Sequence, residues 1–197
     1  MSKENHNPAS PYLAGKLLLA MPSLGDPRFH HAVIFMCQHD ENGAVGLVIN
    51  HAVPNMNFGN LIDQLEFDKD MVIDPNALKI PLMHGGPVDG GRGFILHDAS
   101  YAIKDTILVD DHFAVTSTLP ILKQIAQGKG PERLIFVLGY AGWEAGQLDA
   151  ELKQNAWLTA DATADILFET KVDHQWNKAL AQLGINPAML SGTAGSA

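Results

Sequence analysis

The dipeptide Asn42-Gly43, which stands between two β-rich runs, is the feature that most constrains how this chain folds. Residues 33–41 precede the dipeptide and residues 44–50 follow it, and both runs contain strand-forming residues such as Val and Ile. Asn-Gly accepts positive φ at both central positions of a type I′ turn, which joins the strands of a two-residue hairpin. The sequence therefore predicts a β-hairpin over residues 33–50.

The register of this hairpin determines which side chains share a face. With the dipeptide as the loop, three opposite pairs are expected on one face: Cys37 with Val48, His39 with Gly46, and Phe35 with Asn50. Because side chains alternate between the faces of a strand, the other face carries Ile34, Met36, Leu47 and Ile49. Both faces are largely apolar, so we expect the hairpin to be covered on both sides within the fold.

Further runs predict a fold of the α+β class. Strands are expected at residues 15–20, 79–83, 93–96, 106–109 and 134–138, and helices at residues 58–65, 119–126, 147–155, 162–168 and 173–183. Adjacent strands come first as a hairpin and alternate with helices only later. We therefore expect a mixed β-sheet with an early β-hairpin and flanking helices in a single compact domain.

Length and composition limit the domain organisation. The chain has 197 residues, of which 46% are hydrophobic and 18% charged, as is typical of one soluble globular domain. We expect this domain over residues 12–190, with flexible ends at residues 1–11 and 191–197. The one cysteine, Cys37, excludes an internal disulfide, and the sequence shows neither a signal-peptide pattern nor an apolar run of membrane length. A cytoplasmic location is expected.

The charge balance argues against direct nucleic-acid binding and against attachment to a membrane. Lys and Arg number 13 against 22 Asp and Glu, which gives a formal net charge of -9, and the sequence has no helix-turn-helix pattern or basic arm. The nine histidines are scattered, without HExxH or C-x-x-C spacing. We therefore expect no metal site and no cofactor.

Two nucleophile candidates keep an enzymatic hypothesis open. Ser23 lies in a Ser-x-Gly pattern, but Pro22 stands where a nucleophile elbow needs glycine, which favours a plain turn after the first strand. Cys37 and His39 are two residues apart on a predicted strand, so a histidine-assisted thiolate is the second candidate. A free cysteine in an apolar run is usually buried, which favours a structural Cys37. The alternative function is a hydrolase or acyl-transfer enzyme that uses Cys37 or Ser23 with a nearby histidine.

Two glycine-rich segments are candidate ligand sites. In residues 84–94, successive backbone N–H groups beside Arg92 are suited to hold an anion, and His97 closes the strand that follows. The competing interpretation is a glycine loop in which Arg92 pairs with a carboxylate. Residues 138–148 run from an apolar strand into a helix and contain Trp143, either a ligand platform or, more commonly, a core anchor.

Several motifs, taken in order along nearly the whole chain, resemble those of the AlgH/YqgE family of bacterial proteins. They are Leu13-Ala-Gly-Lys-Leu-Leu-Leu-Ala-Met-Pro-Ser with Asp26-Pro-x-Phe29, the Cys37-x-His39 to Gly46-Leu-Val-Ile-Asn50 hairpin, Gly85-Gly-Pro-Val with Arg92-Gly-Phe and Leu96-His97, and Gly139-Tyr-Ala-Gly-Trp-x-x-Gly-Gln-Leu148 with Asn155-x-Trp-Leu158. The chain departs from the family pattern at His51-Ala52, where Arg-Pro is common, and at Glu144, where Gly is common. The resemblance implies a compact mixed α/β domain in the bacterial cytoplasm, with no known cofactor and no agreed catalytic residues. One branch of the family carries a transcriptional-regulator label.

Polar side chains at strand ends beside the glycine segments lead to the favoured hypothesis, a non-enzymatic binding or regulatory protein. Its pocket is expected to bind a small polar or anionic ligand, or a segment of a protein partner, through Ser23, His39, Asn50, Arg92, His97 and Trp143. All of these except Trp143 are expected to converge on one concave patch. This hypothesis assigns no catalytic residue.

Overall fold

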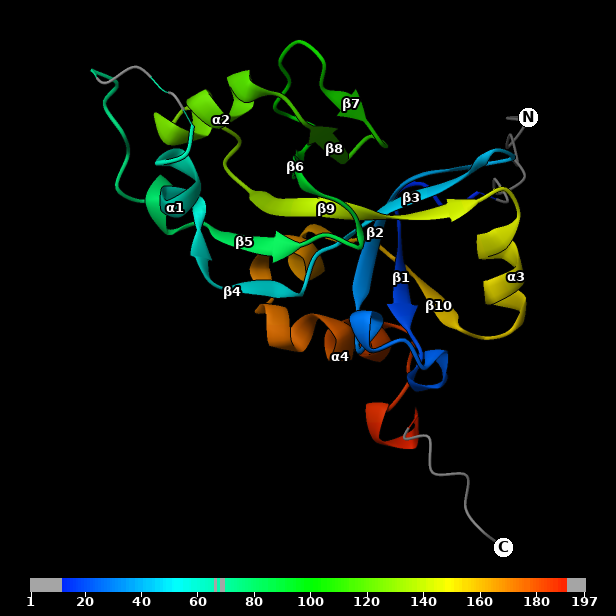
Figure 1. Cartoon of the computed structure of the whole chain (residues 1–197). Coiled ribbons are helices and arrows are strands. Elements are labelled where there is room, and N and C mark those ends of the chain that lie inside the picture. The colour runs from blue at the N-terminus through cyan, green and yellow to red at the C-terminus, as the bar shows by residue number, and fades with distance from the viewer. Residues whose placement is uncertain (1–11, 66, 68–69, 191–197) are drawn as a thin grey trace, which may run out of the picture.

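The computed structural model describes residues 12–65, 67 and 70–190. The ends that the sequence predicts to be flexible, residues 1–11 and 191–197, lie outside the described residues. Strands and helices pack into a single compact α+β domain, as the sequence predicts (Figure 1). Within the described ranges, no helix is long and apolar enough to cross a membrane.

A curled, mostly antiparallel sheet forms the body of the domain (Figure 1). In the described chain its strands are β1 (Lys16–Ala20), β2 (Val33–Asp40), β3 (Gly43–Val48), β4 (Ala52–Asn57), β5 (Pro81–His84), β6 (Val88–Asp98), β7 (Ile107–Leu108), β8 (Phe113–Thr116), β9 (Leu134–Glu144) and β10 (Trp157–Asp161). The strand order is β10-β1-β2-β3-β9-β6-β8-β7, and β5 also pairs with β9, with β4 beyond it. The β5–β9 pair is parallel, so the sheet is mixed as expected.

Helices cover both faces of this sheet. They are α1 (Phe58–Ile62), α2 (Leu119–Ala126), α3 (Gln147–Lys153) and α4 (Val172–Gln182), with 3₁₀ turns at Pro22–Leu24, Pro27–Phe29, Ala77–Lys79 and Pro187–Leu190. The helix expected at residues 162–168 is a π-helical turn at Asp165–Glu169. This turn and α4 share one core with β1, β2 and β3, α3 packs in a second core, and α1 and α2 pack in a third against β5, β6 and β9.

The predicted hairpin forms as β2 and β3, but its loop lies one residue earlier than expected. Asp40 pairs with Gly43. The Asp40 carboxylate fixes this turn by accepting a hydrogen bond from the Asn42 N–H at 2.7 Å. Gly43 is required for a different reason, because a Cβ there would collide with the Trp143 carbonyl oxygen on β9.

A bulge at Cys37 changes the remaining pairs, so the predicted register is wrong. The pairing shifts between Met36 and Gln38, and Cys37 has no partner on β3. The expected pairs of Cys37 with Val48, His39 with Gly46 and Phe35 with Asn50 are replaced by Ile34 with Val48, Phe35 with Leu47, Met36 with Gly46 and His39 with Ala44. Phe35 pairs with Leu47 instead of Asn50, three positions away. Because side chains alternate between the two faces of a strand, a shift by an odd number of residues moves each β3 side chain to the opposite face from the one predicted.

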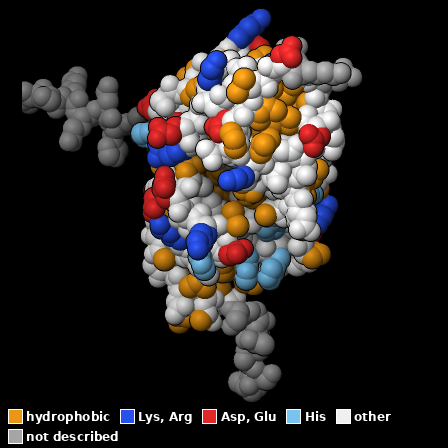
Figure 2. Space-filling view, turned by 90° about the vertical axis from the view of Figure 1, so that its left-hand side faces the viewer, with side chains coloured by type: hydrophobic (Ala, Val, Ile, Leu, Met, Phe, Trp, Pro, Cys, Tyr) orange, Lys and Arg blue, Asp and Glu red, His pale blue; other side chains and the backbone are white. Residues whose placement is uncertain are grey.

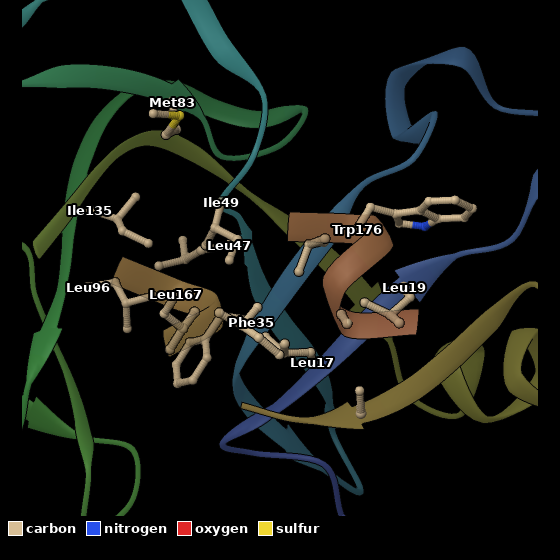
Figure 3. Packing of buried hydrophobic residues seen from close by; sticks show 14 of the residues in the cluster. Leu17, Leu19, Phe35, Leu47, Ile49, Met83, Leu96, Ile135, Leu167 and Trp176 are labelled. Carbon is tan, nitrogen blue, oxygen red and sulfur yellow. The ribbon is translucent and has the colours of Figure 1, made fainter. Parts of the chain in front are cut away.

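Both faces of the hairpin are nevertheless buried, which confirms the expected covering on two sides. Leu47 and Ile49 share the core of Phe35 beside α4 (Figure 3), whereas Val48 joins the core of Ile34 beside α3. These side chains are at most 1% exposed. Each contributes roughly 1.5–3 kcal/mol through the burial of apolar surface.

Three strands, β4, β8 and β10, are absent from the sequence prediction, and both glycine-rich segments are largely strand rather than turn. β9 continues through Gly139 and Gly142 to Glu144, and β6 already begins at Val88. Glycine allows the backbones to approach closely here, since a Cβ on Gly85 would collide with the Gly139 carbonyl oxygen. The high glycine content of residues 84–94 and 138–148, which suggested loops, instead allows these strands to pack closely.

Candidate functional site

The six candidate residues do not gather in one pocket. Asn50 lines a histidine-rich pocket beside α4, and Arg92 lines a separate pocket between α1, α2 and the sheet. Ser23, His39, His97 and Trp143 line neither pocket. The expected shared patch is therefore wrong, because β2 and β6 are separated in the curled sheet by β3 and β9.

His39 and Ser23 lie near opposite ends of the β1–β2 unit. The His39 side chain is buried, accepts a hydrogen bond from the Leu13 N–H at 3.3 Å through Nδ1 and lies 3.8 Å from Asp149 through Nε2. It thus holds the segment before β1 and the helix α3 to the hairpin. Ser23 is exposed in the 3₁₀ turn after β1, in agreement with the turn interpretation.

Trp143 is a core anchor. Its indole N–H donates to Glu151 Oε2 at 2.9 Å, and the Trp157 indole N–H donates to the same oxygen at 2.7 Å. The two rings meet edge to face with centroids 5.9 Å apart. One carboxylate thereby satisfies two indole groups and joins β9, β10 and α3.

Cys37 is partly buried and packs against the core that contains Phe35, and its environment is unsuited to a nucleophile. Its thiol lies 3.9 Å from the Phe35 carbonyl oxygen, the acceptor of a weak hydrogen bond. Although part of the residue is exposed, desolvation raises the pKa of the thiol to about 12. The thiol is therefore protonated near neutral pH, which does not favour the nucleophile hypothesis.

The Arg92 pocket combines an apolar interior with a polar edge. It has a volume of about 250 Å³. Its apolar walls come from α1 and the residues after it, from β6 and β9, and from α2: Leu61, Leu65, Ile95, Phe136, Leu138, Leu119, Ile121 and Leu122. Arg92, Thr116, Ser117 and Thr118 supply the polar groups.

The Arg92 guanidinium is held in place by neutral partners. Its Nε donates to the Ser117 hydroxyl at 3.3 Å, and the Ser117 hydroxyl donates to the Gly93 carbonyl at 2.6 Å. The guanidinium carbon lies 5.0 Å from the centre of the Phe94 ring. The chain has three arginines. Arg28 and Arg133 pair with carboxylates, whereas Arg92 forms no ion pair with any described residue, so the competing interpretation of a paired Arg92 is wrong.

Thr118 is a second polar residue of this pocket, and its hydroxyl is available to form a hydrogen bond with a ligand. It precedes α2 at the N-cap position, but its side chain does not cap the first turn. Its hydroxyl oxygen is buried and has no hydrogen-bond partner among the residues that the structure describes. The first turn of α2 adds the partial positive charge of a helix N-terminus on the same side of the pocket.

His97 lies behind the Arg92 pocket and positions one of its walls. The ring is fully buried, and burial lowers its pKa, so the ring is neutral. Because Nδ1 faces the Asp98 carbonyl oxygen at 2.8 Å, Nδ1 carries the proton and donates. Nε2 then accepts from the Thr116 hydroxyl at 2.9 Å, and Thr116 accepts from Thr106 at 2.8 Å. This chain of donors fixes Thr116, which lines the pocket.

The second pocket, of about 260 Å³, is lined by histidines and α4. Its residues are His30, His31, Asn50, His51, Val172, Asp173, Trp176 and Asn177. The His31 ring stacks between His30 and Trp176, with centroids 4.0 and 4.1 Å away. Histidine side chains gather in one area of the face that Figure 2 draws. Asn50 is committed to the fold here, since its amide oxygen accepts from the Val33 N–H at 2.8 Å and its amide nitrogen donates to the His31 carbonyl at 2.9 Å.

Two residues of this histidine pocket, His31 and His51, are less readily protonated than a histidine in water. Burial, followed by repulsion from His30 and His51, lowers the pKa of His31. Burial also lowers the pKa of His51. Within the described ranges, no group of three or more His, Cys, Asp or Glu side chains is arranged to hold a metal ion. The permanent charge of Arg92 makes its pocket the stronger candidate for an anionic ligand.

Sequence reasoning missed Ser117, Thr118 and the histidines beside Asn50. Thr118 precedes the Leu-Pro start of α2, which identified it as a helix cap rather than as a pocket residue. His30-His31 and His51 are separated in the sequence by the whole hairpin. Only the return of β3 beside the start of β2 brings them together.

Comparisons with known proteins agree over nearly the whole chain. A family model described as AlgH-like (DUF179) matches residues 17–188. A UPF0301 protein of Bradyrhizobium diazoefficiens is 43% identical over 204 residues, which cover 100% of this chain and 95% of the relative. The solution structure of the AlgH protein from Pseudomonas aeruginosa is 38% identical, covers 100% of both chains and has a TM-score of 0.77. A crystal structure from Corynebacterium diphtheriae, 17% identical with a TM-score of 0.67 over 96% of this chain and 92% of that one, is similar in fold.

Proposed function

This chain belongs to the AlgH-like family, as its motifs indicate, and on that premise we propose that it is a non-enzymatic binding protein of the bacterial cytoplasm. Its ligand is a small amphipathic anion, an apolar chain or ring that ends in a carboxylate. The observation that carries this proposal is the Arg92 guanidinium, which lies beside an apolar pocket and forms no ion pair with a described carboxylate. A guanidinium offers a planar pair of donors that matches a carboxylate.

The two halves of the pocket account for the two halves of such a ligand. The walls from α1, α2, β6 and β9 are aliphatic or aromatic and favour an apolar body. At the polar edge, Nε of Arg92 is occupied by Ser117, which orients the guanidinium and leaves its terminal nitrogens for an anion. The buried Thr118 hydroxyl supplies a further donor.

The site supports binding rather than hydrolysis or acyl transfer. Ser117, a hydroxyl at the polar edge, donates to a backbone carbonyl instead of a histidine. Cys37, with a pKa raised to about 12, lies on β2 outside this pocket. An activated nucleophile needs a base within hydrogen-bond reach, and among the described residues neither group has one.

A regulatory role would pass through a protein partner. The formal charge of -9 disfavours contact with DNA. Residues of α1 and α2 both line the pocket, so an occupant packs between them and stabilises one arrangement of this surface. We propose that the partner recognises the arrangement that α1 and α2 adopt when the Arg92 pocket holds its ligand.

The proposal is tested by titrating the protein with octanoate and with octanamide, which has the same chain but no charge. Isothermal titration calorimetry should show that octanoate binds about tenfold more tightly or better, because hydrogen bonds to charged groups contribute about 1.5–3 kcal/mol. Arg92→Ala should reduce the affinity for octanoate to that for octanamide. Arg92→Lys should restore only part of it, since lysine cannot make the paired contact.

Arg28→Ala is the matched control, because Arg28 is also an exposed arginine but already pairs with Asp26 at 2.7 Å. This variant should bind octanoate like the unmodified protein. Equal affinities for octanoate and octanamide, or an Arg92→Ala variant that binds octanoate normally, would refute the proposal.

A further inference from the structure

A buried glutamine on α4 points to a second, chemically different site. Gln175 is 1% exposed, and its Nε2 donates to the Ile166 and Leu167 carbonyl oxygens, each at 3.0 Å. These carbonyls belong to the π-helical turn Asp165–Glu169. A π-helical turn leaves carbonyls outside the regular helical pattern, and such turns are frequent at functional sites. The two bonds use both amide hydrogens of Gln175 and fix the orientation of its side chain.

The remaining polar atom of Gln175 is an unsatisfied acceptor. Its Oε1 is buried and has no hydrogen-bond partner in the part of the chain that the structure describes. The amide cannot be turned over, because Oε1 would then face two carbonyl oxygens. Burial of an acceptor without a donor costs free energy, and such groups are rare in folded proteins.

Gln175 lines a pocket of about 150 Å³ that is otherwise almost wholly apolar. Its walls come from β5, β9, the π-helical turn, the start of α4 and single residues that flank these elements and β3: Ile49, Ile80, Pro81, Met83, Leu134, Ile135, Phe136, Leu167, Phe168, Thr170 and Val172. Figure 3 shows Ile49, Ile135 and Leu167 near one another on the side of the sheet that these helices cover. The Thr170 hydroxyl already donates to the Asp165 carbonyl at 2.7 Å.

We propose that this pocket binds a small apolar molecule of about the size of a benzene ring that carries one O–H or N–H donor, which bonds to Gln175 Oε1. The size follows from the volume, because a cavity of about 150 Å³ lined by aliphatic and aromatic side chains is able to hold benzene. The donor follows from the fixed orientation of the amide. A charged molecule is excluded, since none of the lining residues is ionisable and an unpaired charge in apolar surroundings is strongly disfavoured.

This site is independent of the proposed anion site. The Gln175 pocket offers an acceptor and no positive charge, whereas the Arg92 pocket offers donors and a guanidinium. The two pockets therefore select opposite ligand chemistry.

Phenol and fluorobenzene are the probes, because they have similar sizes and only phenol has a donor. Their dissociation constants are measured by NMR titration of the full chain. We expect phenol to bind about tenfold more tightly than fluorobenzene, the effect of one satisfied hydrogen bond. Binding of neither compound, or equal affinity for both, would overturn the inference.

Gln175→Leu should abolish the preference for phenol, whereas Gln182→Leu should retain it. Gln182 is the matched control because it lies on the same helix but is exposed. Val172→Phe, which places a ring in the pocket, should prevent binding of both probes and keeps the inference testable if Gln175→Leu does not fold. Retention of the preference in Gln175→Leu, or normal phenol binding in Val172→Phe, would contradict the proposed site. Arg92→Ala should bind phenol normally, which separates failure here from failure of the anion site.

Discussion

Replacement of His97 by phenylalanine tests whether the buried donor chain between β6 and β8 stabilises the domain. The ring is fully buried and makes two hydrogen bonds, one to the Asp98 carbonyl at 2.8 Å and one from the Thr116 hydroxyl at 2.9 Å. Phenylalanine keeps the ring but removes both nitrogen atoms. The Asp98 carbonyl still accepts from the Tyr101 N–H at 3.3 Å and the Thr116 hydroxyl still bonds to Thr106, so each group loses one hydrogen bond and keeps another.

The expected loss is about 2 kcal/mol in the free energy of unfolding, since the substitution removes two buried hydrogen bonds that contribute about 1 kcal/mol each. At about 2–4 °C per kcal/mol for a domain of this size, the melting temperature should fall by about 4–8 °C. Thr116→Val alone leaves His97 Nε2 without a donor and should cost about 2 kcal/mol. The double variant removes both partners of one bond, so its loss should be about 1 kcal/mol smaller than the sum of the single losses.

Urea unfolding followed by circular dichroism gives these free energies. His112→Phe is the control, because His112 is exposed near β8 and its replacement should change stability by less than about 0.5 kcal/mol. If the losses of His97→Phe and Thr116→Val add within about 0.4 kcal/mol, the two side chains are not coupled. A stabilising hydrogen bond between His97 and Thr116 would then be refuted.

Two further predictions concern Cys37 and the histidine pocket. Burial raises the pKa of Cys37 to about 12. A thiol reagent at pH 8 should therefore label the native protein about 100-fold more slowly than the urea-unfolded chain, as measured by mass spectrometry. Similar labelling rates would contradict a buried thiol. The lowered pKa values of His31 and His51 mean that the unfolded chain binds protons more readily at these positions. The free energy of unfolding should therefore fall as the pH drops below about 6.5. His51→Asn should flatten this decrease, and an unchanged pH profile would count against the assignment.

Local sequence patterns were sufficient for most elements of the fold. The helix at residues 119–126 has the predicted bounds because Thr118, Pro120 and Gly128 mark its ends by local chemistry. The hairpin follows in the same way from strand-forming residues on both sides of a short turn. Its register does not, because the bulge at Cys37 and the turn made by Asp40 depend on contacts that the Asn-Gly pair does not specify.

The candidate site was predictable only in part. Arg92 was identified because a lone guanidinium in a glycine segment is chemically conspicuous, and the structure places it at a pocket. The predicted convergence of Arg92 with His39 and Ser23 was wrong, because it depends on the order of strands in the sheet, which local patterns do not specify. Gln175 gave no signal at all, because its unsatisfied oxygen arises from the π-helical turn.

The central claim, that the Arg92 pocket binds an amphipathic anion, is tested most directly by mapping octanoate binding through the backbone amide signals of the full chain. The account predicts saturable chemical-shift changes at Gly91, Arg92, Gly93, Ser117 and Thr118, all of which line the pocket. The signals of His30, His31 and His51 should stay unchanged, because these residues line the separate histidine pocket. Shifts confined to the histidine pocket, or no saturable shifts at all, would contradict the claim.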